Sequence, residues 1–231
     1  MKNKMKVLII ENIEIEIIKK KIKNINLYVF KNGRVRISAP LKAKNEIIEN
    51  FIKSKLDWIK KQQNNFSNQV IKPTLKYITG ETHYYKGEKF LLNVILIQGK
   101  QKIEKTDGNI NLYVKDDITF IKKEKLFNEW YRCELKKDIE ILVEKWENII
   151  GVSVNEWRTK KMKTKWGTCN PRAKRIWLNL ELSKKPIRCL EYVVVHEMVH
   201  LLEASHNNRF KAFLDKYLEN WRCLKKELNE A

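Results

Sequence analysis

The stretch VVVHEMVHLL, residues 193 to 202, is the feature that most limits how this chain can fold. It is apolar on nearly every side, with two histidines and one glutamate as its only polar residues. A helix that is hydrophobic all round has to be buried in the protein interior. Residues four apart on a helix lie one turn apart on the same face, as His196 and His200 do here. The fold must therefore bury this helix and still give its histidines a partner.

The same residues form the pattern H-E-x-x-H, which suits a metal ion. Both imidazoles can bind one ion, while Glu197 can reach a water on that ion without being a ligand. The alternative is a buried helix whose histidines only satisfy their neighbours. The chain has only four histidines, so we interpret the pattern as a metal site. The expected chemistry is hydrolysis through a zinc-bound water, with Glu197 as general base.

A catalytic zinc ion needs three protein ligands and one open position. We expect His206 to be the third ligand, brought back by a chain reversal after the helix, and Glu219 is the alternative. The spacing equals that of the metzincins, but Glu203 stands where they have a turn-forming glycine, and their Met-turn is absent. The sequence thus predicts Zn²⁺ bound by His196, His200 and His206.

The group that stabilises the oxyanion is left open among three side chains: Tyr192, Tyr217 and Asn179. None of the four cysteines belongs to a C-x-x-C pair, so a cysteine zinc site is not expected. Cys169 remains a candidate fourth ligand if the metal is structural. His83, far upstream in an expected hairpin, is interpreted as a surface residue.

The chain is expected to be an α+β protein, with a β-rich N-terminal lobe at residues 1–115 and a catalytic core with a small sheet at 116–231. Short alternating runs predict strands at 6–38, with a hairpin at Asn32 and Gly33, and again at 76–114. One amphipathic helix is expected at 43–63 and a long one at 121–149, ended by Gly151. The next expected elements are strand-like runs at 154–169 and 175–182, the histidine helix opened by Pro186, and a helix from its N-cap Ser205.

The chain is strongly basic, with a formal net charge of +20. Residues 158–175, RTKKMKTKWGTCNPRAKR, contain no acidic residue and interleave lysine and arginine with tryptophan. Such a stretch suits single-stranded nucleic acid, but it also suits a solvated strand face or a rim that recognises acidic substrates. The candidate substrate or nucleic-acid contacts are Lys163, Lys165, Trp166 and Trp177. For the two tryptophans, packing in the core is the alternative.

The chain shows no apolar run long enough for a signal peptide or a membrane span, and its cysteines suit a reducing compartment. We therefore expect a cytoplasmic protein with no membrane partner. Its oligomeric state is not predicted.

Several segments resemble the YgjP-like zinc metallopeptidases, which are related to the SprT-like and minimal gluzincin peptidases. They are RVRISAP at 34–40, WGTCN at 166–170, IWLNLEL at 176–182 and LEYVVVHEMVHLLEASHNNRF at 190–210. The resemblance implies a zincin-like core after a β-rich lobe, zinc on the three histidines, Glu197 as the catalytic residue and a protein or peptide substrate. It also implies that a sheet edge near Trp166 or Trp177 holds the substrate backbone by β-augmentation.

Three alternatives to a general peptidase remain open at this point. SprT-like relatives include DNA-dependent proteases, so a DNA-recruited protease is the first. The second is a nucleic-acid-binding module whose metal is structural. The third is a metal hydrolase acting on a non-peptide amide, which H-E-x-x-H does not exclude.

Overall fold

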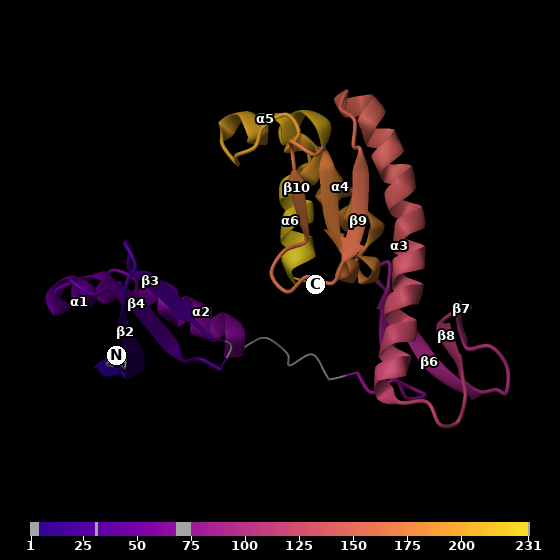
Figure 1. Cartoon of the computed structure of the whole chain (residues 1–231), viewed down its shortest axis with the longest axis horizontal. Helices are drawn as coiled ribbons and strands as arrows, with labels where there is room; N and C mark the ends of the chain where they lie inside the picture. The colour runs from indigo at the N-terminus through magenta and orange to yellow at the C-terminus, as the bar shows by residue number, and fades with distance from the viewer. Residues whose placement is uncertain (1–4, 31, 68–74, 231) are drawn as a thin grey trace. The chain divides into compact units, whose positions relative to one another are not determined.

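The computed structural model describes residues 5–30, 32–67 and 75–230. The chain divides into two compact units, Met1–Thr74 and Leu75–Ala231, each with its own hydrophobic core (Figure 1). This division comes earlier in the chain than the boundary after residue 115 proposed above. The reason is packing, because the strands between 82 and 114 share one core with the long helix that follows them.

The first unit is a four-stranded sheet with two helices. Its elements are β1 (Met5–Ile10), β2 (Ile13–Lys20), β3 (Asn26–Val29), β4 (Val35–Pro40), α1 (Asn45–Lys53) and α2 (Leu56–Ser67). The strand order is β1-β2-β4-β3, with β2 and β4 parallel and the expected hairpin between β3 and β4. The single helix expected at 43–63 is two helices. The helix is interrupted at Ser54, whose hydroxyl donates to the Phe51 carbonyl at 2.8 Å. Such a local hydrogen bond competes with helical hydrogen bonding.

The second unit begins with a four-stranded sheet and a long helix. The sheet holds β5 (Thr82–Tyr85), β6 (Glu88–Leu96), β7 (Lys102–Lys105) and β8 (Asn109–Val114) in the order β5-β6-β8-β7, and α3 (Phe120–Ile150) follows. Gly151 ends α3 in the left-handed conformation, as expected. His83 is buried in β5, 2% exposed, and its ring stacks on Phe127 of α3. The interpretation of His83 as a surface residue was therefore wrong, because the ring fills the contact between β5 and α3.

The rest of the second unit is a three-stranded sheet covered by helices. It comprises β9 (Glu156–Lys160), β10 (Gly167–Asn170), β11 (Arg175–Asn179), the 3₁₀ helix η1 (Leu180–Lys184), α4 (Ile187–Val199), α5 (Asn208–Tyr217) and α6 (Trp221–Glu230). The strand order is β10-β11-β9, so β10 pairs only with β11 within the described residues. The strand predicted at 175–182 ends at Asn179, whose side chain caps η1. Asn207, rather than Ser205, is the N-cap of α5.

The helix α4 is buried as its sequence predicts, with Val194, Val195 and Met198 at 0% exposure. The architecture of both units is mixed α+β, which confirms the predicted fold class. Among the described residues, no helix is long and apolar enough to span a membrane.

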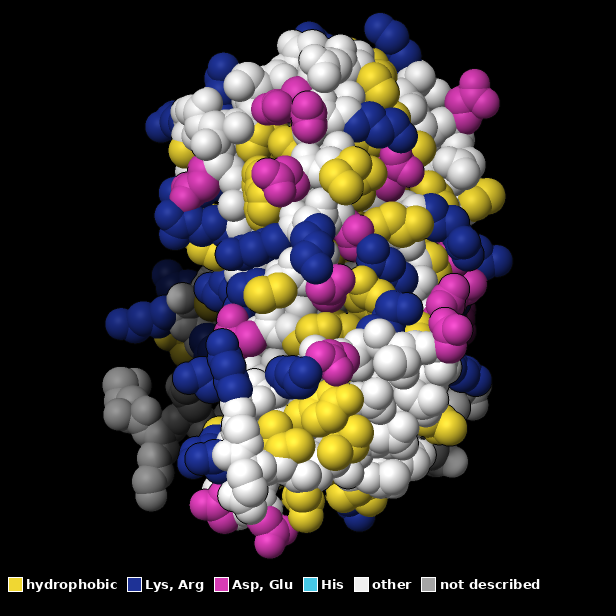
Figure 2. Space-filling model, turned by 90° about the vertical axis from the view of Figure 1, so that its right-hand side faces the viewer, with side chains coloured by type: hydrophobic (Ala, Val, Ile, Leu, Met, Phe, Trp, Pro, Cys, Tyr) yellow, Lys and Arg dark blue, Asp and Glu magenta, His cyan; other side chains and the backbone are white. Residues whose placement is uncertain are grey.

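Basic side chains do not form one continuous patch on the face drawn in Figure 2. Lys and Arg are spread over that face with Asp and Glu between them. The large positive charge therefore does not by itself define a binding surface there, and a specific site has to be argued from individual residues.

Candidate metal centre

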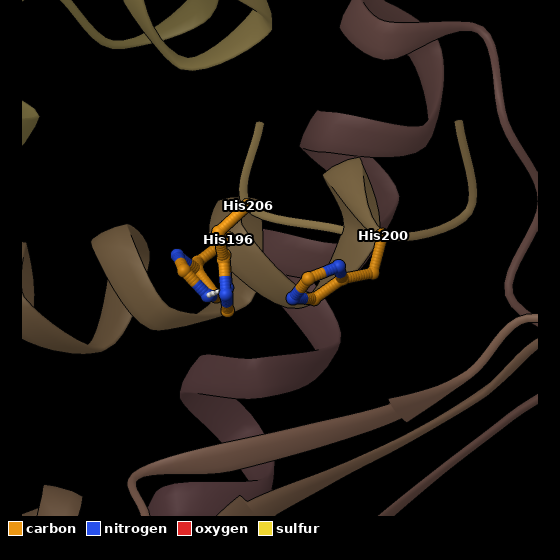
Figure 3. Close-up of side chains that lie close together, drawn as sticks. All are labelled: His196, His200 and His206. Carbon is orange, nitrogen blue, oxygen red and sulfur yellow. Dashed lines mark hydrogen bonds between the residues drawn. The ribbon is translucent and has the colours of Figure 1, made fainter. Parts of the chain in front are cut away.

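The structure brings His196, His200 and His206 together. One ring nitrogen from each lies within 4.8 Å of the other two. His196 and His200 project from α4, while His206 reaches them from the turn between α4 and α5 (Figure 3). The Nε2 atoms of His196 and His206 face each other at 3.0 Å. Three imidazoles that converge in this way form a set of nitrogen donors suited to a metal ion.

The turn after α4 fixes His200. Its Nδ1 lies 3.1 Å from the carbonyl oxygen of Glu203, so Nδ1 donates there and Nε2 is left as the acceptor atom. Such a bond sets the tautomer and orientation of a metal-binding histidine. The Glu203 carboxylate accepts from the amide and hydroxyl of Ser205, at 3.3 and 3.0 Å. Glu203 therefore organises the reversal that returns His206 to α4, in the place where a turn-forming glycine stands in the metzincins.

Phe210 supplies an apolar floor to the three histidines. Its ring centroid lies 4.9 Å from that of His196, 4.6 Å from His200 and 4.7 Å from His206, and the residue is 2% exposed. Sequence reasoning missed this contact. No local pattern signals it, because His206 lies in the turn before α5 begins at Asn208.

The electrostatics of the histidines fit an electron-pair donor role. Burial, followed by repulsion from His200 and His206, lowers the pKa of His196 to about 3. Burial also lowers the pKa of His200. Both rings are thus neutral at pH 7, the form that binds metal ions. The residues therefore fit a zinc ion in both their chemistry and their convergence.

Glu197 lies beside the histidines, buried against β10. An ideal Cβ on Gly167 would lie 2.5 Å from its Oε1, so only glycine leaves room for the carboxylate there. Burial raises the pKa of Glu197 to about 8, against a smaller lowering effect of Lys165. The WGTCN segment thus has a structural reason for its glycine, which the sequence alone did not reveal.

The three histidines, Glu197 and Gly167 line a cavity of about 550 Å³. Tyr192 also lines it, and burial raises the pKa of its hydroxyl to about 12. Asn179 does not line it, because its side chain bonds the backbone of Met162, Lys165 and Glu181. The Tyr217 hydroxyl instead donates to the Ile150 carbonyl at 3.5 Å. Of the three oxyanion candidates, only Tyr192 faces the cavity.

The remaining candidates fall outside the histidine cluster. Glu219 is exposed between α5 and α6, and Cys169 lines the cavity without belonging to the group of converging ligand atoms. Trp166 is half-buried, lines the cavity and donates from Nε1 to Asn229 of α6 at 3.2 Å. Lys165 lines this cavity and a second one beside it, which also holds Lys163 and Trp177.

Three converging imidazoles beside a buried carboxylate form the kind of site that metal-dependent hydrolases use. The YgjP-like metallopeptidase domain family matches residues 23–231, and the chain belongs to this family.

Two crystal structures are similar to part of the chain. The metallopeptidase zymogen abylysin of Pyrococcus abyssi is 19% identical, with a TM-score of 0.36 over 38% of this chain and 89% of its own. The metallopeptidase zymogen jannalysin of Methanocaldococcus jannaschii is 25% identical, with a TM-score of 0.34 over 40% of this chain and 86% of its own. No curated protein matches the chain.

Proposed function

We propose that this metallopeptidase is a zinc-dependent endopeptidase of the H-E-x-x-H type. The observation that carries the proposal is the convergence of three imidazoles, of which those of His196 and His200 are neutral at pH 7, beside the buried side chain of Glu197. His196, His200 and His206 would hold the ion. Zinc supplies Lewis-acid chemistry, since it makes water more acidic and polarises a peptide carbonyl.

The protein's own groups handle the proton and the substrate. In its ionised form the Glu197 carboxylate accepts a proton from the attacking water and returns it to the leaving amine. Burial alone favours the neutral acid, and a cation held by the histidines would favour the ionised form. Its close packing on Gly167 fixes the direction from which it acts. Tyr192 stays protonated at neutral pH, because its pKa is about 12. Its hydroxyl can therefore donate a hydrogen bond to the oxygen that develops negative charge.

The edge strand β10 is the place where a peptide would bind. Its outer edge has no strand partner among the described residues, and Gly167, Thr168 and Cys169 line the cavity. An extended peptide that adds to such an edge gains backbone hydrogen bonds, and its side chains alternate between the two faces. β-Augmentation on β10 would carry the scissile bond past the histidines on α4.

The direct test is cleavage of an unfolded protein by the zinc-loaded chain, with Glu197→Gln as the comparison. We expect this variant to keep its zinc content and to lose at least about a thousandfold in kcat/KM. His206→Ala should lose zinc affinity, whereas Glu219→Ala should keep both zinc and activity. Full activity in Glu197→Gln would overturn the mechanism. Loss of zinc in Glu219→Ala, with His206→Ala unchanged, would move the third ligand to the carboxylate.

The same assay distinguishes a general peptidase from a DNA-recruited one. Cleavage should proceed equally with and without single-stranded DNA. Cleavage only in its presence would make residues 158–175 a recruitment surface.

A further inference from the structure

A second cavity of about 450 Å³ adjoins the histidine site, and the proposed mechanism does not use it. It lies between the loop that joins β9 to β10 and the sheet. Its lining is Lys160, Lys161, Met162, Lys163, Thr164, Lys165, Thr168 and Trp177. Lys165 and Thr168 line both cavities, so the two adjoin at these residues.

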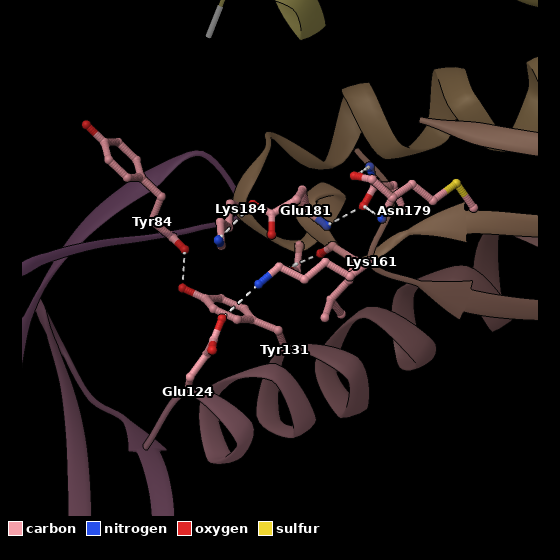
Figure 4. A network of polar contacts seen from close by, with 10 residues as sticks. Tyr84, Glu124, Tyr131, Lys161, Asn179, Glu181 and Lys184 are labelled. Atoms are coloured by element: carbon pink, nitrogen blue, oxygen red, sulfur yellow. Dashed lines mark hydrogen bonds and ion pairs between the residues drawn. The ribbon is translucent and has the colours of Figure 1, made fainter. Parts of the chain in front are cut away.

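The loop is held rigidly from beneath by one buried side chain. Asn179 is 4% exposed. Its Oδ1 accepts from the amide of Met162 at 3.1 Å, and its Nδ2 donates to the carbonyls of Met162 and Lys165 at 3.1 and 2.8 Å. Lys161 ties the loop to α3 through Glu124, at 3.0 Å (Figure 4). The backbone that carries the lysines is therefore preorganised.

Only some of the cations in and near this cavity are neutralised. Lys161 pairs with Glu124, and Arg158, whose guanidinium lies over Trp177, pairs with Glu156. Lys160, Lys163 and Lys165 make no ion pair within the described residues. Three lysines without an ion pair among the described residues thus line one small cavity, which favours a ligand with negative charge.

The cavity lies on the face of the sheet that alternate substrate side chains would reach. Thr168 pairs with Trp177, and both lie on the face opposite Gly167, which packs on Glu197. A peptide on the edge of β10 would point every second side chain toward that Thr168 face. The cavity therefore fits side chains of the same peptide whose backbone passes the histidines.

Nucleic acid fits this cavity less well than an acidic peptide does. The guanidinium of Arg158 lies 5.5 Å from the ring centroid of Trp177, over the face that a base would stack on. Arg172 and Lys174, which also make no ion pair in the part of the chain that the structure describes, lie in the β10–β11 turn at the opposite end of the sheet. The stretch is therefore divided between two ends of the sheet instead of forming one track along a phosphate backbone.

We propose that this lysine cavity binds acidic side chains of the peptide substrate, so that the enzyme prefers acidic segments. The inference rests on the proposed peptidase function and names its substrate class.

Binding can be measured separately from cleavage in the zinc-loaded Glu197→Gln protein. The probes are a short labelled peptide rich in glutamate and its glutamine counterpart, compared by fluorescence anisotropy. We expect the acidic peptide to bind about tenfold more tightly and to lose this preference as salt rises. Lys163→Gln should reduce the preference to about twofold. Lys163→Arg should keep it, as should the matched control Arg172→Gln, which removes one charge outside the cavity.

Equal binding of the two peptides, or a preference that survives Lys163→Gln, would overturn the inference. Tighter binding of oligothymidylate than of the acidic peptide, if it depended on Lys163, would also contradict the inference. If the wild-type chain binds and cleaves both peptides equally, the peptidase function is supported and the acidic preference is contradicted. If the acidic peptide binds selectively but neither peptide is cleaved, the role of the cavity is supported and the peptidase function is contradicted.

Discussion

Gly167 and Glu197 are packed so closely that a single methyl group should separate an active arrangement from a blocked one. In Gly167→Ala the new Cβ would meet the carboxylate at 2.5 Å. We expect Glu197 to be displaced, with a loss of about a hundredfold or more in kcat/KM and little change in zinc affinity. Steady-state kinetics and zinc titration measure the two effects.

Gly99→Ala is the matched control, because a Cβ there meets nothing within 4 Å. Unchanged kcat/KM in Gly167→Ala would mean that the carboxylate can move aside without cost.

The contacts around the histidines show what the sequence can reveal at this scale. The spacing of His196, Glu197 and His200 on one buried helix predicts their juxtaposition, since helix geometry alone places them. The packing of Phe210 and Gly167 was not predictable, because it depends on how α5 and β10 are arranged around α4. That arrangement is tertiary, and no local periodicity encodes it.

The side chain of Asn179 satisfies backbone groups of the loop between β9 and β10, as a capping side chain does at the end of a helix. Asn179→Leu keeps the approximate volume but removes the hydrogen bonds that hold the backbone of Met162, Lys165 and Glu181. We expect a loss of about 3 kcal/mol in the free energy of unfolding, because buried backbone groups are left unpaired. Trypsin should also cleave faster within the loop, at Lys161 to Lys165.

Asn148→Leu, at an exposed site on α3, is the control and should change neither quantity. Native stability together with unchanged trypsin resistance in Asn179→Leu would show that the loop is held by other contacts.

Element boundaries were less predictable than element types. The long helix α3 matches its periodic pattern closely, since Gly151 stops it by a local conformational preference. The strand and 3₁₀ helix at 175–184 could not be separated by pattern, because Leu180 and Leu182 continue the alternation of Ile176 and Leu178. In the structure the Glu181 amide donates to Asn179 Oδ1 at 3.2 Å, and this cap marks the start of the 3₁₀ helix.

At the scale of the whole molecule, all residues of the proposed site belong to the unit Leu75–Ala231, which has its own core. We expect residues 75–231 expressed alone to fold cooperatively and to bind one zinc ion per chain. Circular dichroism during thermal unfolding and metal analysis would measure this. An unfolded fragment would show that residues 1–74 are required for its stability.

The stability of the molecule should depend on pH through His83. Burial lowers the pKa of His83 below its ordinary value of 6.5, against the opposing effect of Glu81, whose carboxylate lies 3.0 Å away. The unfolded chain therefore takes up a proton before the folded one does. The stabilising contribution is complete above pH 6.5 and is lost as the pH falls toward the lower folded value.

His83→Gln keeps a donor for Glu81 but cannot titrate in this range. The difference in the free energy of unfolding between the two proteins, measured by urea denaturation from pH 7.5 to 5, should narrow or reverse on acidification. A difference independent of pH would exclude His83 as the source.

The thiol of Cys169, on β10 beside the cavity, has a consequence for the durability of the enzyme. Burial, reinforced by Glu197, raises its pKa to about 12. At neutral pH the sulfur is thus almost entirely the thiol, which reacts slowly with peroxide and alkylating reagents. The exposed thiols Cys133, on α3, and Cys223, on α6, do not line the cavity. Mild oxidation should therefore modify the exposed thiols on the surface of this protein and leave the thiol beside its reaction centre intact.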